Sequence, residues 1–253
     1  MKAFILAAGL GTRLKPWTDS HPKALVPVGG IPMLERVILR LRDNGFNDIV
    51  VNVHHFSDQI ISFLANNDFG VTVRLSDESD RLLDTGGGLL KASELFGNDQ
   101  GPVFVHNVDI LSDAPLNDLM RQHKESGRDI SLVTSPRDSS RKLIFGPDGT
   151  LEGWHNLITE EYRPAGIKPS PDSHESAFSG IYIMERNAIS ALGHFAEVSR
   201  IDKFPIMDFF LSAPPDINIG EIRLEALNLI DIGKPETLLK AESLFRDLGT
   251  KNF

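Results

Sequence analysis

Apolar runs and helix-like segments alternate along the first half of this 253-residue chain, and this alternation narrows the possible folds more than any other feature. Short apolar runs such as AFILAAG predict buried strands, whereas apolar residues spaced three or four apart predict helices. The predicted strands cover 3–9, 48–55, 71–76, 102–109 and 129–135, and the predicted helices cover 33–45, 57–67, 87–97 and 115–127. Strands and helices that alternate in this way imply right-handed crossovers and a mostly parallel sheet, so we predict an α/β protein.

The predicted sheet also indicates where a ligand would bind. In parallel sheets of this kind, ligands lie beyond the carboxyl ends of the strands. Residues 9–13, 76–86 and 107–109 each follow a predicted strand, so we expect them to be neighbours in the fold. Ser57 is the expected N-cap of the second helix.

The second half of the chain is less periodic. RKLIFGPDGTLEGWHN (141–156) reads as a hairpin, and 160–176 reads as a proline-rich loop. Further along we predict a strand at 177–184, a short helix at 206–213, one or two strands within 221–233, and a closing helix at 235–249 that begins at Pro235. We therefore expect a single domain over 1–253 with an irregular lobe from about 140 to 225. No further C-terminal β-helix or acetyltransferase domain is expected.

Charge and composition exclude some classes of partner. The formal net charge of −9 argues against binding to nucleic acid or to anionic membranes, which need a basic surface. Arg13, Lys15 and Lys23 nevertheless cluster near the N-terminus, opposed there only by Asp19, which fits a small phosphorylated ligand. The chain has no cysteine, no signal-peptide cleavage pattern and no long apolar span, so we predict a cytoplasmic protein.

The GLGTRL stretch (9–14) is typical of a turn that can hold a phosphate, because glycines let backbone N–H groups face an anion. It matches neither of two common phosphate motifs. A dinucleotide fingerprint needs glycine at position 14, where this chain has Leu14, and a P-loop needs G-K-[ST] where it has T-R-L. Arg13 instead offers a guanidinium that can bind phosphate oxygens bidentately. Read alone, the stretch also fits an ordinary turn with a solvated arginine.

Lys23 lies in HPKALVPVGGIPML, between Pro22 and Pro27, which stiffen the backbone around it. A lysine on such a rigid backbone segment is suited to neutralising a phosphate as a point charge. A surface lysine in a proline-rich loop is the alternative interpretation of this segment taken by itself.

Together these two segments, LAAGLGTRLKPWTDSHPKALVPVGGIPML, resemble the signature of the sugar-1-phosphate nucleotidyltransferases, with Trp17 where leucine is usual. The resemblance implies a Rossmann-like, three-layer α/β/α fold with a mixed, mostly parallel sheet. It also implies a nucleotide-binding half at 1–139, a small sugar-binding lobe at 140–225, and a last part, 226–253, that carries a metal ligand and the closing helix.

RLLDTGGGLLKA (81–92) has three successive glycines that lead into a predicted helix. They fit either a flexible loop or a second place where the backbone comes close to a bound ligand. In the family this loop recognises the base. Its D-T-G-G-G form is most similar to the short bacterial N-acetylmuramate 1-phosphate uridylyltransferases. The nucleotide contacts implied by both loops are Leu6, Ala8, Gly9, Gly11, Thr12, Arg13, Asp84, Thr85, Gly86 and Gly87.

Asp109 ends the predicted strand FVHNVD, where a carboxylate is plausible either as a turn cap or as a cation ligand. The resemblance implies that it is a metal ligand, with Val108 where glycine is usual. It implies the same for Asp231 in LNLIDIGKPETLLKA, where Asn228 and Lys234 depart from the family pattern. Two carboxylates with phosphate oxygens and waters suit Mg²⁺.

The expected catalytic residues are Arg13, Lys23 and Asp109, with Lys23 bridging the attacking sugar phosphate. Asn107, Trp154, Ser179 and Gly180 are the expected sugar contacts, and Lys142 lies in the same lobe.

The resemblance implies that a sugar 1-phosphate attacks the α-phosphorus of a nucleoside triphosphate and releases pyrophosphate. We expect UTP with N-acetylmuramate 1-phosphate, or alternatively GTP with a mannose- or heptose-type 1-phosphate. The partners expected are these two substrates, with no nucleic acid or membrane, and the chain is expected to be a monomer or a small homo-oligomer. A glycosyltransferase that uses nucleotide sugars and a non-catalytic nucleotide-binding relative are the other classes left open.

Overall fold

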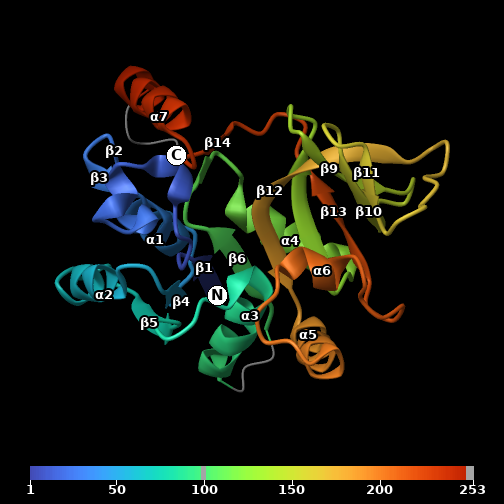
Figure 1. The fold of residues 1–253 in the computed structure, drawn as a ribbon, viewed down its shortest axis with the longest axis horizontal. Coiled ribbons are helices and arrows are strands. Elements are labelled where there is room, and N and C mark those ends of the chain that lie inside the picture. The colour runs from blue at the N-terminus through green and yellow to red at the C-terminus, as the bar shows by residue number, and fades with distance from the viewer. Residues whose placement is uncertain (98–100, 249–253) are drawn as a thin grey trace.

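One mixed sheet runs through the molecule in the computed structural model, which describes residues 1–97 and 101–248 (Figure 1). Its strands follow the order β11-β10-β9-β12-β6-β1-β4-β5, and β8 pairs with both β12 and β13. They are β1 (Lys2–Leu6), β4 (Asp48–Val53), β5 (Thr72–Asp77), β6 (Val103–Asn107), β8 (Ile130–Ser135), β9 (Arg141–Phe145), β10 (Leu151–Asn156), β11 (Glu161–Arg163), β12 (His174–Met184) and β13 (Ile219–Arg223). Two smaller pairs join β2 (Pro27–Val28) to β3 (Ile31–Pro32) and β7 (Ile110–Ser112) to β14 (Leu229–Asp231).

The N-terminal half of the sheet is parallel, as the alternation of strands and helices predicts. β1 pairs in parallel with β4 and with β6, and β4 pairs in parallel with β5. β12 is antiparallel to β6, β8 and β9, so the sheet as a whole is mixed and mostly parallel in its N-terminal half. The predicted α/β class with a mixed, mostly parallel sheet is confirmed.

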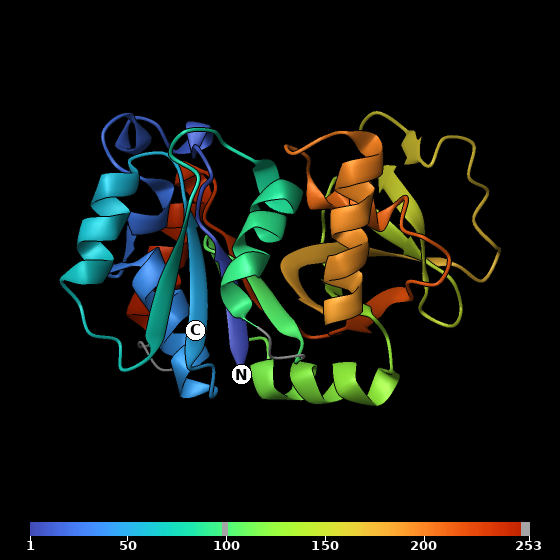
Figure 2. The same ribbon diagram turned by 90° about the horizontal axis from the view of Figure 1, so that it is seen from below.

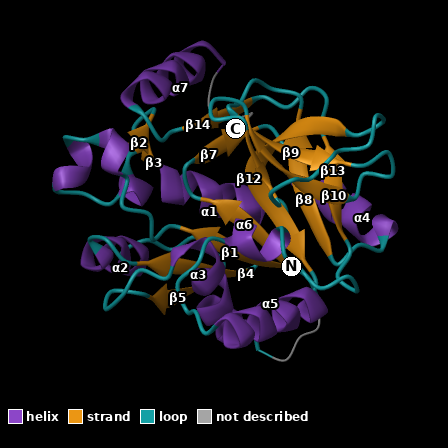
Figure 3. Cartoon of the chain, turned by 45° about the vertical axis from the view of Figure 1, so that its right-hand side comes forward, coloured by secondary structure: helices purple, strands orange, loops and turns teal. Residues whose placement is uncertain are grey.

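Helices cover both faces of the sheet because side chains alternate along each strand (Figure 3). Ala3 and Ile5 of β1 share a core with α1, α2 and α4, whereas Phe4 shares the opposite core with α3, α5 and α6. A third, smaller core joins α7 to the segment around Leu14 and Val28. The helices are α1 (Met33–Asp43), α2 (Ser57–Ala65), α3 (Asp84–Ser93), α4 (Leu116–Ser126), α5 (Arg186–Ser199), α6 (Ile206–Phe210) and α7 (Pro235–Leu248), with 3-10 turns η1 (Thr12–Leu14), η2 (Trp17–Asp19), η3 (Lys23–Leu25) and η4 (Glu94–Phe96).

Two local predictions need correction, and one helix was not predicted. Ser57 begins α2 as expected, but the residue that precedes the helix is Phe56, with φ 52°, and no side chain caps the end. Helix α3 begins at Asp84 rather than at 87, so the three glycines lie inside its first turns. Helix α5 was not predicted, although Ala188, Ile189, Leu192 and Ala196 have helical spacing and are buried.

The lobe beyond residue 140 is more regular than predicted. The expected hairpin is confirmed by the antiparallel pairing of β9 with β10. The loop predicted for 160–176 is wrong in part, because Glu161–Arg163 forms β11 and β12 begins at His174. These strands extend the main sheet at the end opposite β5 (Figure 2). The one or two strands predicted within 221–233 are two, β13 and β14, and of the helix predicted at 235–249 only Gly249 lies outside the described residues.

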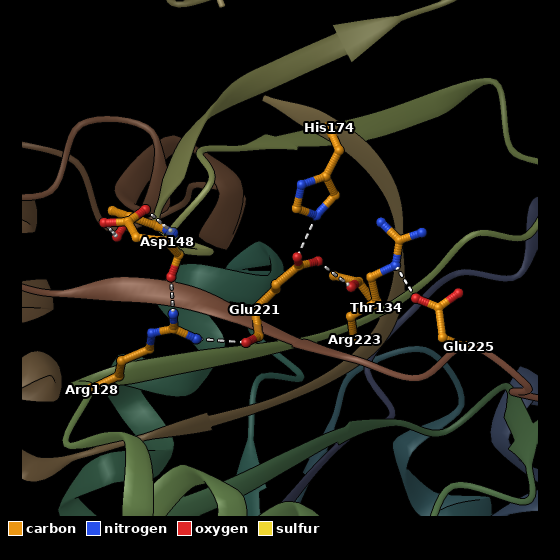
Figure 4. A network of polar contacts seen from close by, with 8 residues as sticks. Arg128, Thr134, Asp148, His174, Glu221, Arg223 and Glu225 are labelled. Atoms are coloured by element: carbon orange, nitrogen blue, oxygen red, sulfur yellow. Dashed lines mark hydrogen bonds and ion pairs between the residues drawn. The ribbon is translucent and has the colours of Figure 1, made fainter. Parts of the chain in front are cut away.

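A polar network ties this lobe to the main sheet (Figure 4). Arg128 donates to the carbonyl oxygens of Glu221 (2.6 Å) and Asp148 (2.8 Å), and so joins β13 to the turn between β9 and β10. The Glu221 carboxylate accepts from Thr134 Oγ1 at 2.8 Å and contacts the ring of His174 at the start of β12. The lobe is therefore fixed against β8 and β13.

Within residues 1–97 and 101–248, no helix is both long enough and apolar enough to cross a membrane.

Candidate active site

The ends of β1 and β6 and the start of α3 enclose a cavity of about 270 Å³, which we call the β1–α3 cavity. The predicted neighbours 9–13, 76–86 and 107–109 do meet here, because parallel strands end at the same edge of the sheet. The cavity is lined by Leu6, Ala8, Gly9, Lys23, Asn52, Leu82, Asp84, Thr85, Asn107, Val108 and Asp109. Five residues predicted as nucleotide contacts are among them: Leu6, Ala8, Gly9, Asp84 and Thr85.

The turn after β1 is folded tightly onto the following segment. Gly11 has φ +63°, and its carbonyl oxygen accepts from Thr18 Oγ1 (2.9 Å) and from the Leu14 amide (2.8 Å). A Cβ at this position would lie 2.8 Å from Thr18 Cγ2 and 2.9 Å from Lys23 Cβ, which is closer than side chains pack. Glycine is therefore required here, and it brings the turn against Lys23.

Lys23 forms an ion pair with Asp109, and both side chains are about 15% exposed (14% and 15%). Lys23 begins the turn η3, in which Leu25 N donates to Pro22 O at 3.0 Å and Val26 N donates to Lys23 O at 3.1 Å. These hydrogen bonds fix the backbone of Lys23, as the flanking prolines predict, and the ion pair with Asp109 fixes its ammonium group. Two of the three expected catalytic residues are therefore in contact.

Asp231 lies next to this pair. It ends β14, whose antiparallel register sets Asp231 opposite Ile110, and Ile232 N donates to Asp109 O at 2.8 Å. Partial desolvation and the like charge of Asp109 raise the pKa of the Asp231 carboxyl, against the opposing effect of Lys23 and Arg13. The like charges of two carboxylates held this close repel each other, and a divalent cation bound by both would relieve that repulsion.

Arg13 reaches the same place from the turn after β1. A Cβ added at Gly233 would lie 2.6 Å from Arg13 Nη2 and 2.7 Å from Asp231 Oδ1, so the two side chains flank this glycine. Arg13 is exposed and, like Gly11 and Thr12, does not line the β1–α3 cavity. It lies at the margin of the carboxylate pair, with its guanidinium accessible.

A second cavity of about 520 Å³ is lined by Asp231, and we call it the β9–β12 cavity. All four predicted sugar contacts line it, namely Asn107, Trp154, Ser179 and Gly180, together with Lys142. Asn107 lines both cavities, so the carboxylate pair lies where the two meet. Sequence reasoning missed Arg137, Arg141, Arg163 and Phe178, which line the β9–β12 cavity from β11, β12 and the segment around β9.

The wall formed by β12 is irregular at this point. Its register with β8 shifts between Phe178 and Tyr182, as at a β-bulge next to a site. Gly180 has φ +78°, and a Cβ there would lie 2.7 Å from Asn107 Nδ2. Ser179 is buried, and its hydroxyl donates to Val133 O at 2.7 Å and accepts from Ile181 N at 3.2 Å. The hydroxyl of Ser179 therefore holds the strand, and its contact with a sugar stays a prediction.

Gly86 and Gly87 face away from the cavity. Gly86 N donates to Phe204 O at 2.9 Å, and Thr85 Oγ1 accepts from Ile206 N at 2.8 Å. A Cβ on Gly87 would overlap the carbonyl oxygen of Asp202. These glycines let α3 pack directly on residues 202–206, which gives them a structural role, and their contact with a nucleotide stays a prediction.

A buried pair that the sequence analysis did not single out lies beneath the β1–α3 cavity. Asn52 Oδ1 accepts from the amides of Ala7 (2.7 Å) and Ala8 (3.2 Å), and Asn52 Nδ2 donates to Glu78 Oε1 at 2.7 Å. Glu78 Oε2 in turn accepts from Leu83 N at 3.0 Å. The pair thus joins the turn after β1 to the start of α3. A polar residue within the apolar run IVVNV was the available signal for Asn52.

We expect Asn52→Ala to lower the free energy of unfolding by about 1–3 kcal/mol, because buried amides and a carboxylate lose their partner. Burial raises the pKa of Glu78, whereas the hydrogen bond from Asn52 lowers it by stabilising the ionised form. The destabilisation should therefore be largest at neutral pH and shrink as acid protonates Glu78. Urea denaturation at several pH values measures it, with the exposed Asn218→Ala as control. Equal losses in both variants would contradict the role of Asn52.

The sequence is similar to known proteins along almost its whole length. A family model described as "Nucleotidyl transferase" matches residues 2–247. A mannose-1-phosphate guanyltransferase of Gibberella zeae is 30% identical over 253 residues, which cover 99% of this chain and 66% of the relative. An N-acetylmuramate alpha-1-phosphate uridylyltransferase of Caulobacter vibrioides is 44% identical over 112 residues, 43% of this chain and 46% of the relative. The chain spans just under two thirds of the length of the curated guanyltransferases it matches.

Solved structures resemble the whole fold. A putative glucose-1-phosphate thymidylyltransferase from Bacillus anthracis superposes with a TM-score of 0.78 at 20% sequence identity, covering 99% of this chain and 97% of that one. At this identity the likeness concerns the fold alone, and it matches the mixed sheet with helices on both faces.

Proposed function

The chain belongs to the nucleotidyl transferase family, and from this we propose that it transfers a nucleoside monophosphate from a nucleoside triphosphate to a sugar 1-phosphate. The observation that carries the proposal is the carboxylate pair of Asp109 and Asp231 at the meeting point of two cavities. A reaction that joins two substrates at one phosphorus needs such a junction, because each substrate must approach from its own side.

In this proposal the β1–α3 cavity receives the nucleotide and the β9–β12 cavity receives the sugar phosphate. A phosphate oxygen of the sugar 1-phosphate attacks the α-phosphorus, the bond from that phosphorus to the bridging oxygen of the β-phosphate breaks, and pyrophosphate leaves. A phosphate monoester has a second pKa of about 6 and is largely ionised at neutral pH. The attack therefore needs no general base from the protein.

Asp109 and Asp231 are the residues that would hold Mg²⁺. The fit rests on the closeness of these two carboxyl groups, and two protein carboxylates leave room for phosphate oxygens and waters. When bound, the ion would supply Lewis-acid stabilisation of the phosphate charge. Among the described residues no cluster of three or more acidic or histidine side chains offers a larger metal site.

The chain's own cations would supply the remaining charge stabilisation. Lys23, held against Asp109, would lie between the nucleotide and the sugar phosphate in this arrangement, and Arg13 lies beside Asp231 at Gly233. Preorganised charges of this kind act most strongly on the charge that develops during transfer. Asp84 and Thr85 at the start of α3 would contact the nucleotide on its base side.

The base and the sugar are separate parts of the proposal. The curated guanyltransferases that match nearly the whole chain favour GTP over the UTP expected from the D-T-G-G-G loop. The shorter match to a uridylyltransferase supports UTP as the second candidate. We therefore rank guanylyl transfer to a mannose- or heptose-type sugar phosphate above uridylyl transfer on the comparisons alone.

The test is a matrix of ATP, CTP, GTP, UTP and dTTP against a set of sugar 1-phosphates, with Mg²⁺ present, scored by pyrophosphate release. We expect release with one triphosphate strongly preferred and only when a sugar 1-phosphate is present. Nucleotide binding without release in every combination would favour a non-catalytic relative. Sugar transfer from a nucleotide sugar, without pyrophosphate, would instead identify a glycosyltransferase.

A further inference from the structure

Four basic side chains line the β9–β12 cavity, and Asp231 is the one carboxylate among its lining residues. The basic residues are Arg137, Arg141, Lys142 and Arg163. In the proposed reaction the phosphate of a sugar 1-phosphate comes close to Asp231, because the transfer takes place beside the carboxylate pair. A cation that meets this phosphate must therefore lie near Asp231 and must not be neutralised by another carboxylate.

Three of the four basic groups do not meet these conditions. Arg163 forms an ion pair with Asp208, with 2.7 Å between Nη2 and Oδ1. Lys142 donates to the carbonyl oxygen of Arg137 at 2.6 Å. Arg141 is exposed at the first position of β9, where water screens its charge. These three groups are therefore ion-paired, hydrogen-bonded to the backbone or solvated.

Arg137 is the fourth group, and its guanidinium is half-buried near Asp231. Burial lowers the pKa of Arg137 and the negative charge of Asp231 raises it, so the two side chains are close enough to interact. The guanidinium donates to two carbonyl oxygens, those of Phe178 (2.8 Å from Nη2) and Asp138 (3.4 Å from Nη1), and its Nε has no hydrogen-bond partner in the described part of the chain. A guanidinium has more N–H donors than these two oxygens accept, so Arg137 can still bind an anion.

The hydrogen bond to Phe178 fixes Arg137 at the irregular part of β12. The register of β12 with β8 shifts between Phe178 and Tyr182. Within this stretch Gly180 comes so close to Asn107 that a Cβ would lie 2.7 Å from Asn107 Nδ2. Asn107 lines both cavities. The guanidinium is therefore held on the wall of the β9–β12 cavity, next to the place where the two cavities meet.

A cation at this place would offset a repulsion that the proposed reaction cannot avoid. A sugar 1-phosphate is largely a dianion at neutral pH, and it must approach a triphosphate of the same sign. Lys23 is paired with Asp109, and Arg13 lies outside the β9–β12 cavity, beside Asp231. Arginine binds phosphate oxygens through paired N–H donors, so Arg137 supplies on the acceptor side the charge that the other two do not.

We propose that Arg137 binds the phosphate of the sugar 1-phosphate and holds it beside Asp231 for attack on the α-phosphorus. This inference rests on the proposed function and adds a catalytic residue to it. The guanidinium stays protonated, so it contributes charge and hydrogen bonds and takes up no proton. Its hydrogen bond to Phe178 O holds it in place before the substrate arrives, which makes its charge more effective.

Arg137→Gln tests the proposal with the triphosphate and the sugar 1-phosphate that the wild-type protein uses best. Glutamine removes the charge but retains an N–H donor for Phe178 O. We expect kcat/KM for the sugar 1-phosphate to fall by roughly tenfold to a hundredfold, as for hydrogen bonds to a charged group, and KM for the triphosphate to stay within about twofold. Arg137→Lys keeps the charge without the paired donors and should lose less. Pyrophosphate release with each substrate varied in turn measures both constants.

Arg121→Gln is the matched control, because Arg121 is an exposed arginine of α4 outside both cavities. It should keep the wild-type constants for both substrates. Arg137→Ala separates contact with the phosphate from support of the fold. Guanidinium chloride at millimolar concentration should restore part of its activity, because the small cation can occupy the space left by the side chain, whereas sodium chloride should not. Thermal unfolding of each variant measures its stability.

The outcomes separate this inference from the function on which it rests. Wild-type kcat/KM for the sugar 1-phosphate in Arg137→Gln overturns the inference and leaves nucleotidyl transfer standing. Equal losses for both substrates, with lower thermal stability and no rescue by guanidinium, would make Arg137 a structural support of β12 and also overturn its contact with the phosphate. Absence of pyrophosphate release by the wild-type protein in every combination overturns the proposed function, and the inference with it.

Discussion

Replacement of Asp231 by Asn is expected to lower pyrophosphate release by roughly a hundredfold or more, the effect usual when a charge-stabilising group of a transfer reaction is lost. The same change should leave the free energy of unfolding unaltered or raise it. Desolvation and the like charge of Asp109 raise the pKa of Asp231, so its ionised form is disfavoured in the folded protein, and the neutral amide removes that cost. A loss of activity without a loss of stability would therefore mark Asp231 as a functional residue.

The measurements are steady-state pyrophosphate release over a range of Mg²⁺ concentrations and urea denaturation of the same preparations. Asp216→Asn serves as the control, since Asp216 is exposed and away from both cavities. Asp109→Asn should give a similar loss of turnover, but it also removes the ion-pair partner of Lys23 and is expected to cost stability. Near-normal turnover of both variants at limiting Mg²⁺ would rule out the metal assignment.

Gly87→Ala should destabilise the fold by about 1–3 kcal/mol, because a methyl group at this position overlaps the backbone of Asp202 and forces α3 away from the segment 202–206. The carbonyl oxygen of Asp202 belongs to the main chain and cannot move aside as a flexible side chain would. The start of α3 also lines the β1–α3 cavity through Asp84 and Thr85, so KM for the nucleotide should rise as well.

Gly193→Ala is the matched control, because Gly193 also lies inside a helix and its nearest neighbour, Leu90 Cδ1, would be 3.6 Å from the new methyl group. Alanine favours a helix over glycine by about 1 kcal/mol, so this variant should be as stable as the wild type or more stable. Thermal and urea unfolding compare the two. If Gly87→Ala were as stable as the wild type while nucleotide binding fell, a direct contact with the nucleotide would be the better explanation for Gly87.

The sequence was most informative where apolar runs and turn residues act locally. β1, β4 and β6 follow from their apolar runs, and the meeting of residues 9–13, 76–86 and 107–109 follows from the rule that parallel strands end together. The start of α3 could not be read in this way. Its glycines resemble a loop in sequence, and only the contact with residues 202–206, over a hundred positions away, shows why they lie within a helix.

The missed site residues could not be predicted for a similar physical reason. Arg137, Arg141 and Arg163 stand in the part of the chain with the weakest periodicity, and the strand register of β9, β10 and β11 decides which of them reach one cavity. The Asn52–Glu78 pair is likewise formed between two strands and a loop. Spacing along the sequence carries no information on such pairings, whereas a polar residue in an apolar run at least indicates that a partner exists.

The pairing of β12 with strands at both ends of its length affects how such a chain can diversify. Its first residues pair with β9, and its last residues pair with β6 and β8, so one continuous strand carries both the outer hairpin and a wall of the central sheet. Replacement of the β9–β11 segment would change one wall of the β9–β12 cavity, while β6 keeps its register with β1 and Asp109 keeps its place. If the β9–β12 cavity receives the acceptor as proposed, acceptor preference could change by exchange of this segment, independently of the β1–α3 cavity.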